Sequence, residues 1–281
     1  MSIAAAVPAS TVVLLRGEHP FEVFLVRRND SIAFLGGAHV FPGGRVDASD
    51  HSDDFIGGGR LQADAQVVIT ARMPDVPAEV AIAHHVAAVR ELFEEAGVLL
   101  ARSLTAASVE RLTTDRRDLL GGRITFADIV RREHLQLALD ELAYFAHWVT
   151  PEIEIRRFDT RFFIARAPHG QTPIHDEGET THSEWMAPAA AIERSRAGVI
   201  SLPPPTWTTL QMLAKFDAID AVLDWARGKP IPRVQPRFEK RGEQTLLFYP
   251  GDPMYPPVEG FEATETRFLL QNRQWIPITP D

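Results

Sequence analysis

The chain of 281 residues contains no cysteine. Disulfides, thiolate zinc sites, iron–sulfur clusters and cysteine nucleophiles are therefore excluded. Basic residues are also in the minority, since 29 Lys and Arg stand against 38 Asp and Glu and give a formal net charge of −9. Such a chain has no general attraction to a phosphate backbone, so we expect no nucleic-acid partner.

Long hydrophobic runs are absent as well. Every apolar stretch falls well short of the roughly 18–20 residues that a membrane span needs, so we expect no membrane partner. The segment 1–8 is apolar but has no basic start, which argues against a signal peptide and favours a cytoplasmic protein. Hydrophobic residues make up 45% and charged residues 24% of the chain, a balance that is typical of a globular protein with a core.

The apolar patterns predict both strands and helices. Segments 10–16 and 21–27 are short and rich in β-branched or aromatic residues, as expected of two strands. Apolar residues recur at helical spacing from about Pro77 to Ala96, and Gly97 suits the end of that helix. Further expectations are a long polar excursion at 45–78, a helical segment at 105–146, a strand at 161–165 and a helix from about 203 to 227.

Three glutamates share one face of the predicted helix. Glu91, Glu94 and Glu95 lie at positions i, i+3 and i+4, and like charges at such spacing repel by roughly 0.2–0.5 kcal/mol per pair. Mg²⁺ prefers carboxylate oxygens and retains waters that a phosphate can replace, so the pattern predicts a divalent-metal site. A solvated acidic helix face is the simpler alternative that these residues leave open.

Two neighbouring features support the metal site. Arg90 adjoins the glutamates and could orient one of their carboxylates. Upstream, Phe41-Pro-Gly-Gly44 is a glycine turn at the end of a predicted strand, where the backbone can approach other groups closely. Such a turn can offer a carbonyl to a metal or amides to a phosphate, although Pro-Gly-Gly is also ordinary turn chemistry.

Together the two segments resemble the sequence motif of the Nudix hydrolases. That motif is Gly, five residues, Glu, seven residues, and then Arg-Glu-U-x-Glu-Glu-x-Gly-U, with U a bulky aliphatic residue. Here Gly44 is followed by five residues and Asp50, and 90–98 matches the second half at every fixed position. The sequence departs from the motif at two points, because Asp50 replaces glutamate and 39 residues instead of seven separate it from Arg90. The role of Asp50 is therefore left open.

The interrupted motif resembles the longer Nudix branch that includes mammalian mitochondrial and peroxisomal coenzyme A diphosphatases. Coenzyme A hydrolases of the family carry Arg, a small residue, three residues, Arg, three residues, Gly, three residues and Phe-Pro-Gly-Gly. Arg28, Gly37 and 41–44 fit this pattern, whereas Asn29 and Ala33 depart from it. The leading substrate that the resemblance implies is coenzyme A or an acyl derivative. ADP-ribose, NADH, dinucleotides and damaged nucleotides are the alternatives.

The resemblance implies hydrolysis of a diphosphate by water that a divalent metal, Mg²⁺ or Mn²⁺, activates. The implied metal ligands are Glu91, Glu94, Glu95 and the carbonyl of Gly44. Arg90 is expected to hold one carboxylate in position as part of the catalytic set. The implied substrate contacts are Arg27, Arg28 and Gly43.

Some relatives take the general base from a later loop, which corresponds here to 172–185. The candidates are Asp176, Glu177, Glu179 and Glu184. Of these, we expect Glu184 to be the additional catalytic carboxylate. For each of the four, a solvated loop acid is the alternative.

The implied fold is an α/β/α sandwich with a mixed sheet and the catalytic helix on one face. We expect a single elaborated domain over 1–281, enlarged by an insertion at about 51–78, the helical segment at about 105–146 and a C-terminal extension at about 203–281. The alternative of another class is a non-catalytic Nudix sensor beside a DNA-binding module. Residues 200–281 contain 9 Lys and Arg against 10 Asp and Glu, without a basic recognition helix, which disfavours it. A homodimer is one assembly that the sequence allows.

Overall fold

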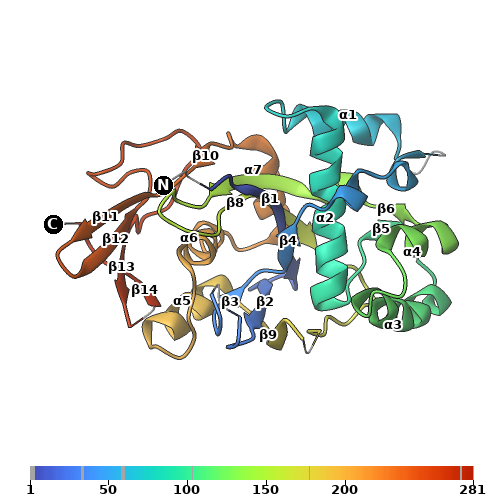
Figure 1. Cartoon of the computed structure of the whole chain (residues 1–281), viewed down its shortest axis with the longest axis horizontal. Helices are drawn as coiled ribbons and strands as arrows, with labels where there is room; N and C mark the ends of the chain where they lie inside the picture. The colour runs from blue at the N-terminus through green and yellow to red at the C-terminus, as the bar shows by residue number, and fades with distance from the viewer. Residues whose placement is uncertain are drawn as a thin grey trace.

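The computed structural model describes residues 4–32, 35–57, 61–102, 104–176, 178–272 and 274–280. Within these ranges a mixed sheet of eight strands separates two layers of helices (Figure 1). Its strands are β1 (Val7–Arg16), β2 (Glu22–Arg28), β3 (His39–Val40), β4 (Gly43–Arg45), β7 (Ala143–Val149), β8 (Phe158–Arg166), β9 (Thr180–Met186) and β10 (Arg233–Val234). The predicted α/β fold with a mixed sheet is confirmed.

The strand order of the sheet is β10-β7-β8-β1-β2-β3, with β4 paired to β1 and β9 paired to β2. The pairs β1–β8 and β10–β7 are parallel, and the other pairs are antiparallel. Successive side chains of a strand point to opposite faces. In β1, Val12 and Leu14 therefore enter one hydrophobic core, whereas Val13 and Leu15 enter a second core on the other face.

The first face of the sheet is covered by α2 (Ala78–Ala96), on which Arg90 and the three predicted metal-binding glutamates lie. This confirms the helix expected from about Pro77 to Ala96. It ends at Gly97, whose φ of 68° is a left-handed conformation that glycine adopts freely. Around it lie α1 (Ala63–Ala71), α3 (Ala106–Leu120) and α4 (Phe126–Arg132). None of the helices in the described ranges is long and apolar enough to cross a membrane.

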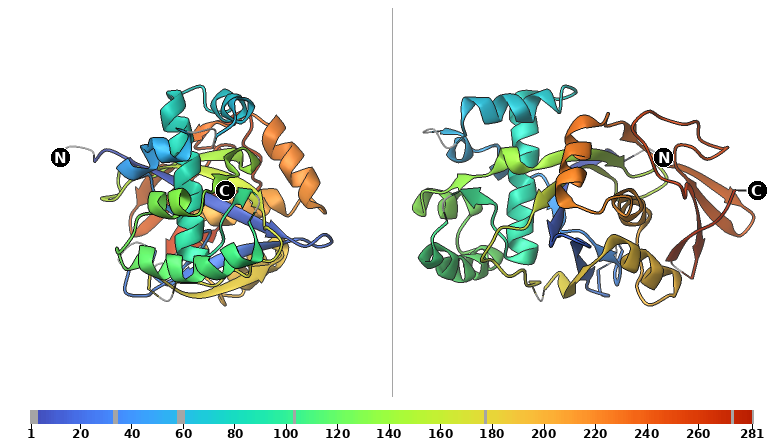
Figure 2. Two further views of the ribbon diagram at one scale, coloured as in Figure 1. Left: turned by 90° about the vertical axis from the view of Figure 1, so that its right-hand side faces the viewer. Right: turned by 180° about the vertical axis from the view of Figure 1, so that it is seen from behind.

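The second face is covered by α5 (Pro188–Arg196), α6 (Pro204–Leu213) and α7 (Ile219–Gly228), as the rear view in Figure 2 shows. A separate antiparallel sheet follows, formed by β11 (Arg237–Arg241), β12 (Gln244–Phe248), β13 (Arg267–Gln271) and β14 (Gln274–Pro277). Leu247, Tyr249 and Phe268 from this region are buried in the same core as Trp207 of α6. The C-terminal extension therefore contributes directly to the second core.

The expectation of a helical segment over 105–146 was wrong for its last part. After α3 and α4 the chain pairs β6 (Gln136–Leu137) with β5 (Ala101–Arg102) and then enters β7. All seven residues of β7 are buried. A strand that is buried on both faces lacks alternation of polar and apolar residues, so periodicity cannot distinguish it from a buried helix.

The expected polar excursion at 45–78 does not loop away from the domain but packs against α2. Ile69 of α1 is buried in the first core. Arg72 follows that helix, and its Nη2 donates to the carbonyl oxygens of Ala226 (3.0 Å) and Lys229 (3.1 Å) at the end of α7. The insertion therefore links the two helical layers.

Phe93 tests the contribution of α2 to the first core. Its side chain is fully buried, and its ring centroid lies 6.2 Å from that of Phe126. We expect Phe93→Ala to lower the free energy of unfolding by about 3–5 kcal/mol, because it leaves a cavity in the core. Glu79→Gln, at an exposed position of the same helix, should change it by less than about 1 kcal/mol. Chemical denaturation measures both values, and equal losses would contradict this packing.

Candidate functional site

The glycine turn lies directly against the glutamates of α2. The backbone N–H of Gly43 donates to Glu95 Oε2 at 3.0 Å. A Cβ atom built on Gly44 would lie 2.5 Å from Cδ of Glu91, which is far inside van der Waals contact. Only a residue without a side chain lets the Glu91 carboxylate approach the strand this closely. Two segments that are distant in sequence are thus brought together.

Arg90 lies at the centre of the cluster and is only 5% exposed. Its Nη1 donates to Oε1 of Glu91 (2.8 Å) and Oε1 of Glu94 (3.3 Å). Its Nη2 donates to the carbonyl oxygen of Arg45 at 2.8 Å. One guanidinium group therefore fixes two of the three glutamates relative to the glycine turn.

Asp50 holds Arg90 from the other side. Nε and Nη2 of Arg90 donate to Oδ1 and Oδ2 of Asp50 at 2.8 and 2.9 Å, in a bidentate pair. The Asp50 carboxylate also accepts the N–H of Asp47 at 2.8 Å, and the residue is only 2% exposed. It lies in the short helix η1 (Ala48–His51), which packs on α2 and places this shorter carboxylate within reach. The long insertion leaves the site immediately after it.

The three glutamates are crowded and poorly hydrated. Burial raises the pKa of Glu91 to about 7, an effect that Arg90 partly offsets and Glu94 increases. Burial raises the pKa of Glu94 as well. Burial and the neighbouring Glu91 charge raise the pKa of Glu95 well above its usual range. Arg90 alone does not compensate these charges, and an additional cation would favour the ionised forms.

The donor set fits a hard divalent cation. Glu91, Glu94 and Glu95 offer carboxylate oxygens, which Mg²⁺ and Mn²⁺ prefer. Over the described ranges, no group of three or more acidic or histidine side chains is already arranged as a metal site. Glu91 and Glu94 instead face Nη1 of Arg90, and Glu95 faces the N–H of Gly43.

The structure separates the two arginines that were expected to contact substrate. Arg28 lines a cavity beside the glutamates, and its Nε has no hydrogen-bond partner within the described ranges. Arg27 points to the other face of β2, where its Nη2 donates to Asp30 at 2.7 Å. Arg27 does not line the cavity, so the structure does not bring it together with Arg28 and the glutamates. Ala33, at the second arginine position of the coenzyme A motif, lies outside the described residues.

Glu184 is not brought to the glutamate cluster. It pairs with Leu25 across β9 and β2, so its side chain leaves the sheet on the face opposite α2. There Arg194 Nη1 donates to its Oε2 at 2.6 Å. Glu179, at the start of the same strand pair, lines the cavity instead, and its charge contributes to the raised pKa of Glu95.

The remaining acids of that loop have other positions. Asp176 accepts hydrogen bonds from the N–H groups of Glu179 (2.9 Å) and Thr180 (2.9 Å), so it shapes the loop. Glu177 lies outside the described residues. Side chains of β9 alternate between the two faces of the sheet, but this alternation does not say which face Glu184 enters. Its pairing with Leu25 on β2 was needed to assign it to the face opposite α2.

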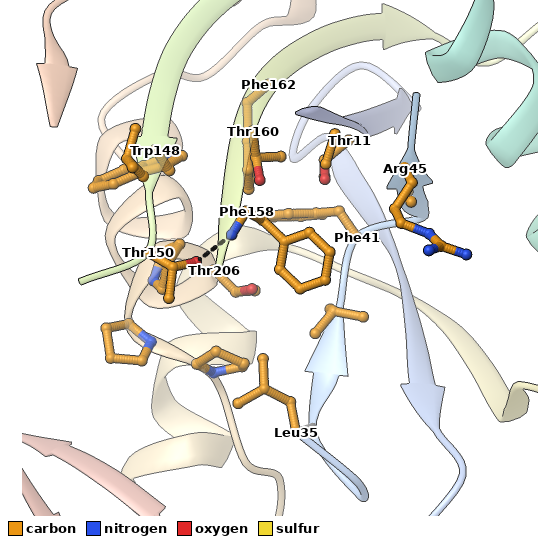
Figure 3. A pocket seen from close by; sticks show the side chains of 18 of the residues that line it. Thr11, Leu35, Phe41, Arg45, Trp148, Thr150, Phe158, Thr160, Phe162 and Thr206 are labelled. Carbon is orange, nitrogen blue, oxygen red and sulfur yellow. Dashed lines mark hydrogen bonds between the residues drawn. The ribbon is translucent and has the colours of Figure 1, made fainter. Parts of the chain in front are cut away.

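The cavity beside the glutamates has a volume of about 590 Å³. Figure 3 shows Arg45 on one side of it, Trp148, Thr150 and Thr206 on the other, and Phe41, Phe158 and Thr160 between them. Glu91, Glu94 and Glu179 line it together with the glycine turn. The cavity therefore joins a charged region at α2 to an aromatic region under α6. Sequence analysis missed this aromatic region, because its residues come from separate segments with no motif in common.

The family model that matches the chain describes the NUDT19 Nudix domain and covers residues 2–213. The acyl-coenzyme A diphosphatase NUDT19 of Homo sapiens is 28% identical over 276 residues, which cover 84% of this chain and 72% of that protein. Its Xenopus laevis counterpart is 27% identical over 274 residues, with the same coverage. A solved NUDIX hydrolase from Alicyclobacillus acidocaldarius is 24% identical, with a TM-score of 0.60, and covers 79% of this chain and 97% of its own. This last likeness concerns the fold.

Asp50→Asn tests the buried pair with Arg90. Removing one partner of a buried ion pair costs about 3–5 kcal/mol, so we expect a loss of that order in the free energy of unfolding. Asp53→Asn, at an exposed position of the same segment, is the matched control and should change it by no more than about 0.5 kcal/mol. Chemical denaturation measures both losses. A loss for Asp50→Asn no larger than that of the control would show that the pair with Arg90 does not stabilise the fold.

The raised pKa of Glu91 predicts how stability depends on metal and pH. Folding raises this pKa from 4.5 to about 7, so the metal-free protein binds more protons when folded and loses stability as the pH rises through that window. A divalent cation needs the ionised carboxylate, so its stabilisation should grow over the same window. We expect Mg²⁺ to raise the melting temperature more at pH 8 than at pH 5.5, relative to EDTA. Equal shifts, or an unchanged effect in Glu91→Gln, would count against this metal site.

Proposed function

The chain belongs to the NUDT19 Nudix domain family, and from this premise we propose that it hydrolyses the diphosphate linkage of coenzyme A and acyl-coenzyme A. Water adds to one phosphorus and the P–O–P bond breaks. The products are 3′,5′-ADP and phosphopantetheine or its S-acyl form. The observation that carries the proposal is the cavity, because it joins the motif glutamates to a region large enough for the rest of a long substrate.

The motif residues have distinct tasks in this reaction. A bound Mg²⁺ or Mn²⁺ supplies Lewis acidity and lowers the pKa of the attacking water. Glu91, Glu94 and Glu95 would hold it, with the carbonyl of Gly44 as a further candidate ligand. Arg90, held by Asp50, keeps Glu91 and Glu94 from turning away from the glycine turn.

We assign the additional loop carboxylate to Glu179. This residue lines the same cavity as Glu91 and Glu94, and its charge acts on Glu95. It can accept a proton from water within the cavity, a task for which a carboxylate must lie beside the reacting phosphate. Glu184 is unsuited to this task, because its carboxylate is bound to Arg194 and does not line the cavity.

Two arginines are suited to the phosphates of the substrate. Arg28 and Arg45 both line the cavity beside the glycine turn. Among the described residues, the Nε of Arg28 has no hydrogen-bond partner, which leaves a donor for a phosphate oxygen. Gly43 was expected to contact substrate. In this structure its N–H donates to Glu95, so the amide helps to hold a proposed metal ligand in place.

Glu94→Gln and Glu95→Gln should each lower kcat by at least about a hundredfold, since each removes a metal-binding charge. Glu193→Gln on the exposed side of α5 is the control and should keep the wild-type rate. The assay uses coenzyme A, acyl-coenzyme A, ADP-ribose, NADH and a diadenosine polyphosphate, with Mg²⁺ or Mn²⁺. Turnover of ADP-ribose or NADH in preference to every coenzyme A derivative would refute the proposed substrate. Wild-type rates in both glutamate variants would refute the metal assignment.

Gly44→Ala tests the close approach of Glu91 to the turn. The added Cβ would meet the Glu91 carboxylate, which is the mobile end of a side chain, so the fold should survive while the carboxylate is displaced. We expect a loss of at least about tenfold in kcat, with a melting temperature near that of the wild type. Gly228→Ala, where a Cβ meets open space, is the matched control. A fully active Gly44→Ala protein would show that this contact is dispensable.

A further inference from the structure

The C-terminal extension, whose sheet lies apart from α2 in Figures 1 and 2, builds one end of the cavity. Leu247, Tyr249 and Trp275 line it from that extension, and Trp148 of β7 lies beside them. The rings of Trp148 and Tyr249 meet edge to face, with centroids 5.3 Å apart. The three extension residues lie beyond position 213, where the match to the family model ends. Three of the four side chains of this aromatic end therefore lie in the part of the chain that the family model does not match, and Trp148 lies in the part that it does.

Charge is distributed unevenly along the cavity. The described lysines and arginines that line it are Arg28, Arg45 and Arg90, and all three lie beside the glycine turn or the glutamates. The charged residue that accompanies the β7–β8 wall is an acid, Glu154. The aromatic end, in the described part of the chain, thus offers no lysine or arginine to neutralise a phosphate.

The start of α6 reinforces this difference. The N-terminus of a helix usually presents free N–H groups to anions. Here the first two helical residues, Pro204 and Pro205, have no N–H, so only the third of the first three helical residues, Thr206, has one. The prolines therefore present hydrocarbon surface to the cavity they line.

These features distinguish the two arms of the proposed substrate. The 3′-phospho-adenosine arm of coenzyme A carries an additional phosphate and requires cations. The pantetheine arm carries neutral amides and ends in a thiol or an apolar acyl chain. Thr11, Thr160 and Thr206 line the cavity with hydroxyl groups that suit neutral amides, and the aromatic end suits an acyl chain.

We infer that the aromatic end formed by Trp148, Leu247, Tyr249 and Trp275 binds the acyl end of the pantetheine arm, and that the C-terminal extension thereby selects acyl-coenzyme A over free coenzyme A. This inference rests on the proposed function. With the diphosphate at Glu91 and Glu94, the 3′-phospho-adenosine arm lies on the arginine side and the acyl arm extends under α6.

Trp275→Ala is the most direct test, because Trp275 is only partly buried and its loss should spare the fold. Ile276→Ala is the matched control, since the neighbouring side chain points to the other face of β14 and does not line the cavity. The kcat/KM is measured for free, acetyl-, octanoyl- and dodecanoyl-coenzyme A. The ratio of dodecanoyl- to free coenzyme A should fall about tenfold in Trp275→Ala, as expected when roughly two methylene groups lose their contact. Inhibition by 3′,5′-ADP should stay at the wild-type level.

Two results would overturn the inference. One is a chain-length preference in Trp275→Ala that equals that of Ile276→Ala. The other is a weakening of 3′,5′-ADP inhibition in Trp275→Ala, which would place the adenosine arm at the aromatic end.

Binding measured in EDTA distinguishes failure of this inference from failure of the proposed hydrolysis, because it does not depend on turnover. Calorimetry of the same coenzyme A series compares wild type with Trp275→Ala. Affinity that rises with chain length in the wild type and not in the variant supports the acyl site even without turnover. Affinity that does not depend on chain length in the wild type overturns it.

Discussion

The buried pair of Arg90 and Asp50 is the interaction on which the site depends. Arg90 lies on α2 and Asp50 lies at the end of the segment that follows the glycine turn, so their two hydrogen bonds fix one segment to the other. The remaining donors of Arg90 then hold Glu91, Glu94 and the carbonyl of Arg45. Because both partners are buried, loss of Arg90 would leave the Asp50 charge uncompensated, and loss of Asp50 would leave the buried Nε of Arg90 without its partner. The 39 residues between Asp50 and Arg90 leave this arrangement intact, since the pair joins the two ends of that segment.

The cluster combines two demands that oppose each other in the absence of a metal. Metal binding needs several carboxylates within one small volume, whereas burial and mutual repulsion favour their protonated forms. The raised pKa values of the three glutamates express this conflict. Arg90 reduces it for Glu91 and Glu94, and the Gly43 N–H reduces it for Glu95. A divalent cation would offset the repulsion between the carboxylates that is left, so affinity for metal and the stability of the folded chain are coupled.

The additions to the family core enter its packing rather than extending from it. The insertion contributes Ile69 to the first core, and its Arg72 binds the end of α7. The C-terminal extension contributes Leu247 and Tyr249 both to the second core and to the wall of the cavity. A change at Leu247 or Tyr249 therefore affects stability and the shape of the cavity together, which is why a less buried position such as Trp275 and a matched variant on the same strand are needed to separate the two effects.

The sequence by itself determined the helix α2, the glutamates that share its face and the need for glycine in the turn before it. These features follow from local spacing and backbone geometry within short segments. Only the tertiary structure decided that Asp50 braces Arg90, that Glu179 and not Glu184 faces the cavity, and that 143–149 is a strand. It also assembled the aromatic end of the cavity from β7 and the C-terminal extension. The physical reason is that these properties depend on which face of the sheet a side chain enters and on contacts between distant segments, and neither leaves a periodic pattern in the chain.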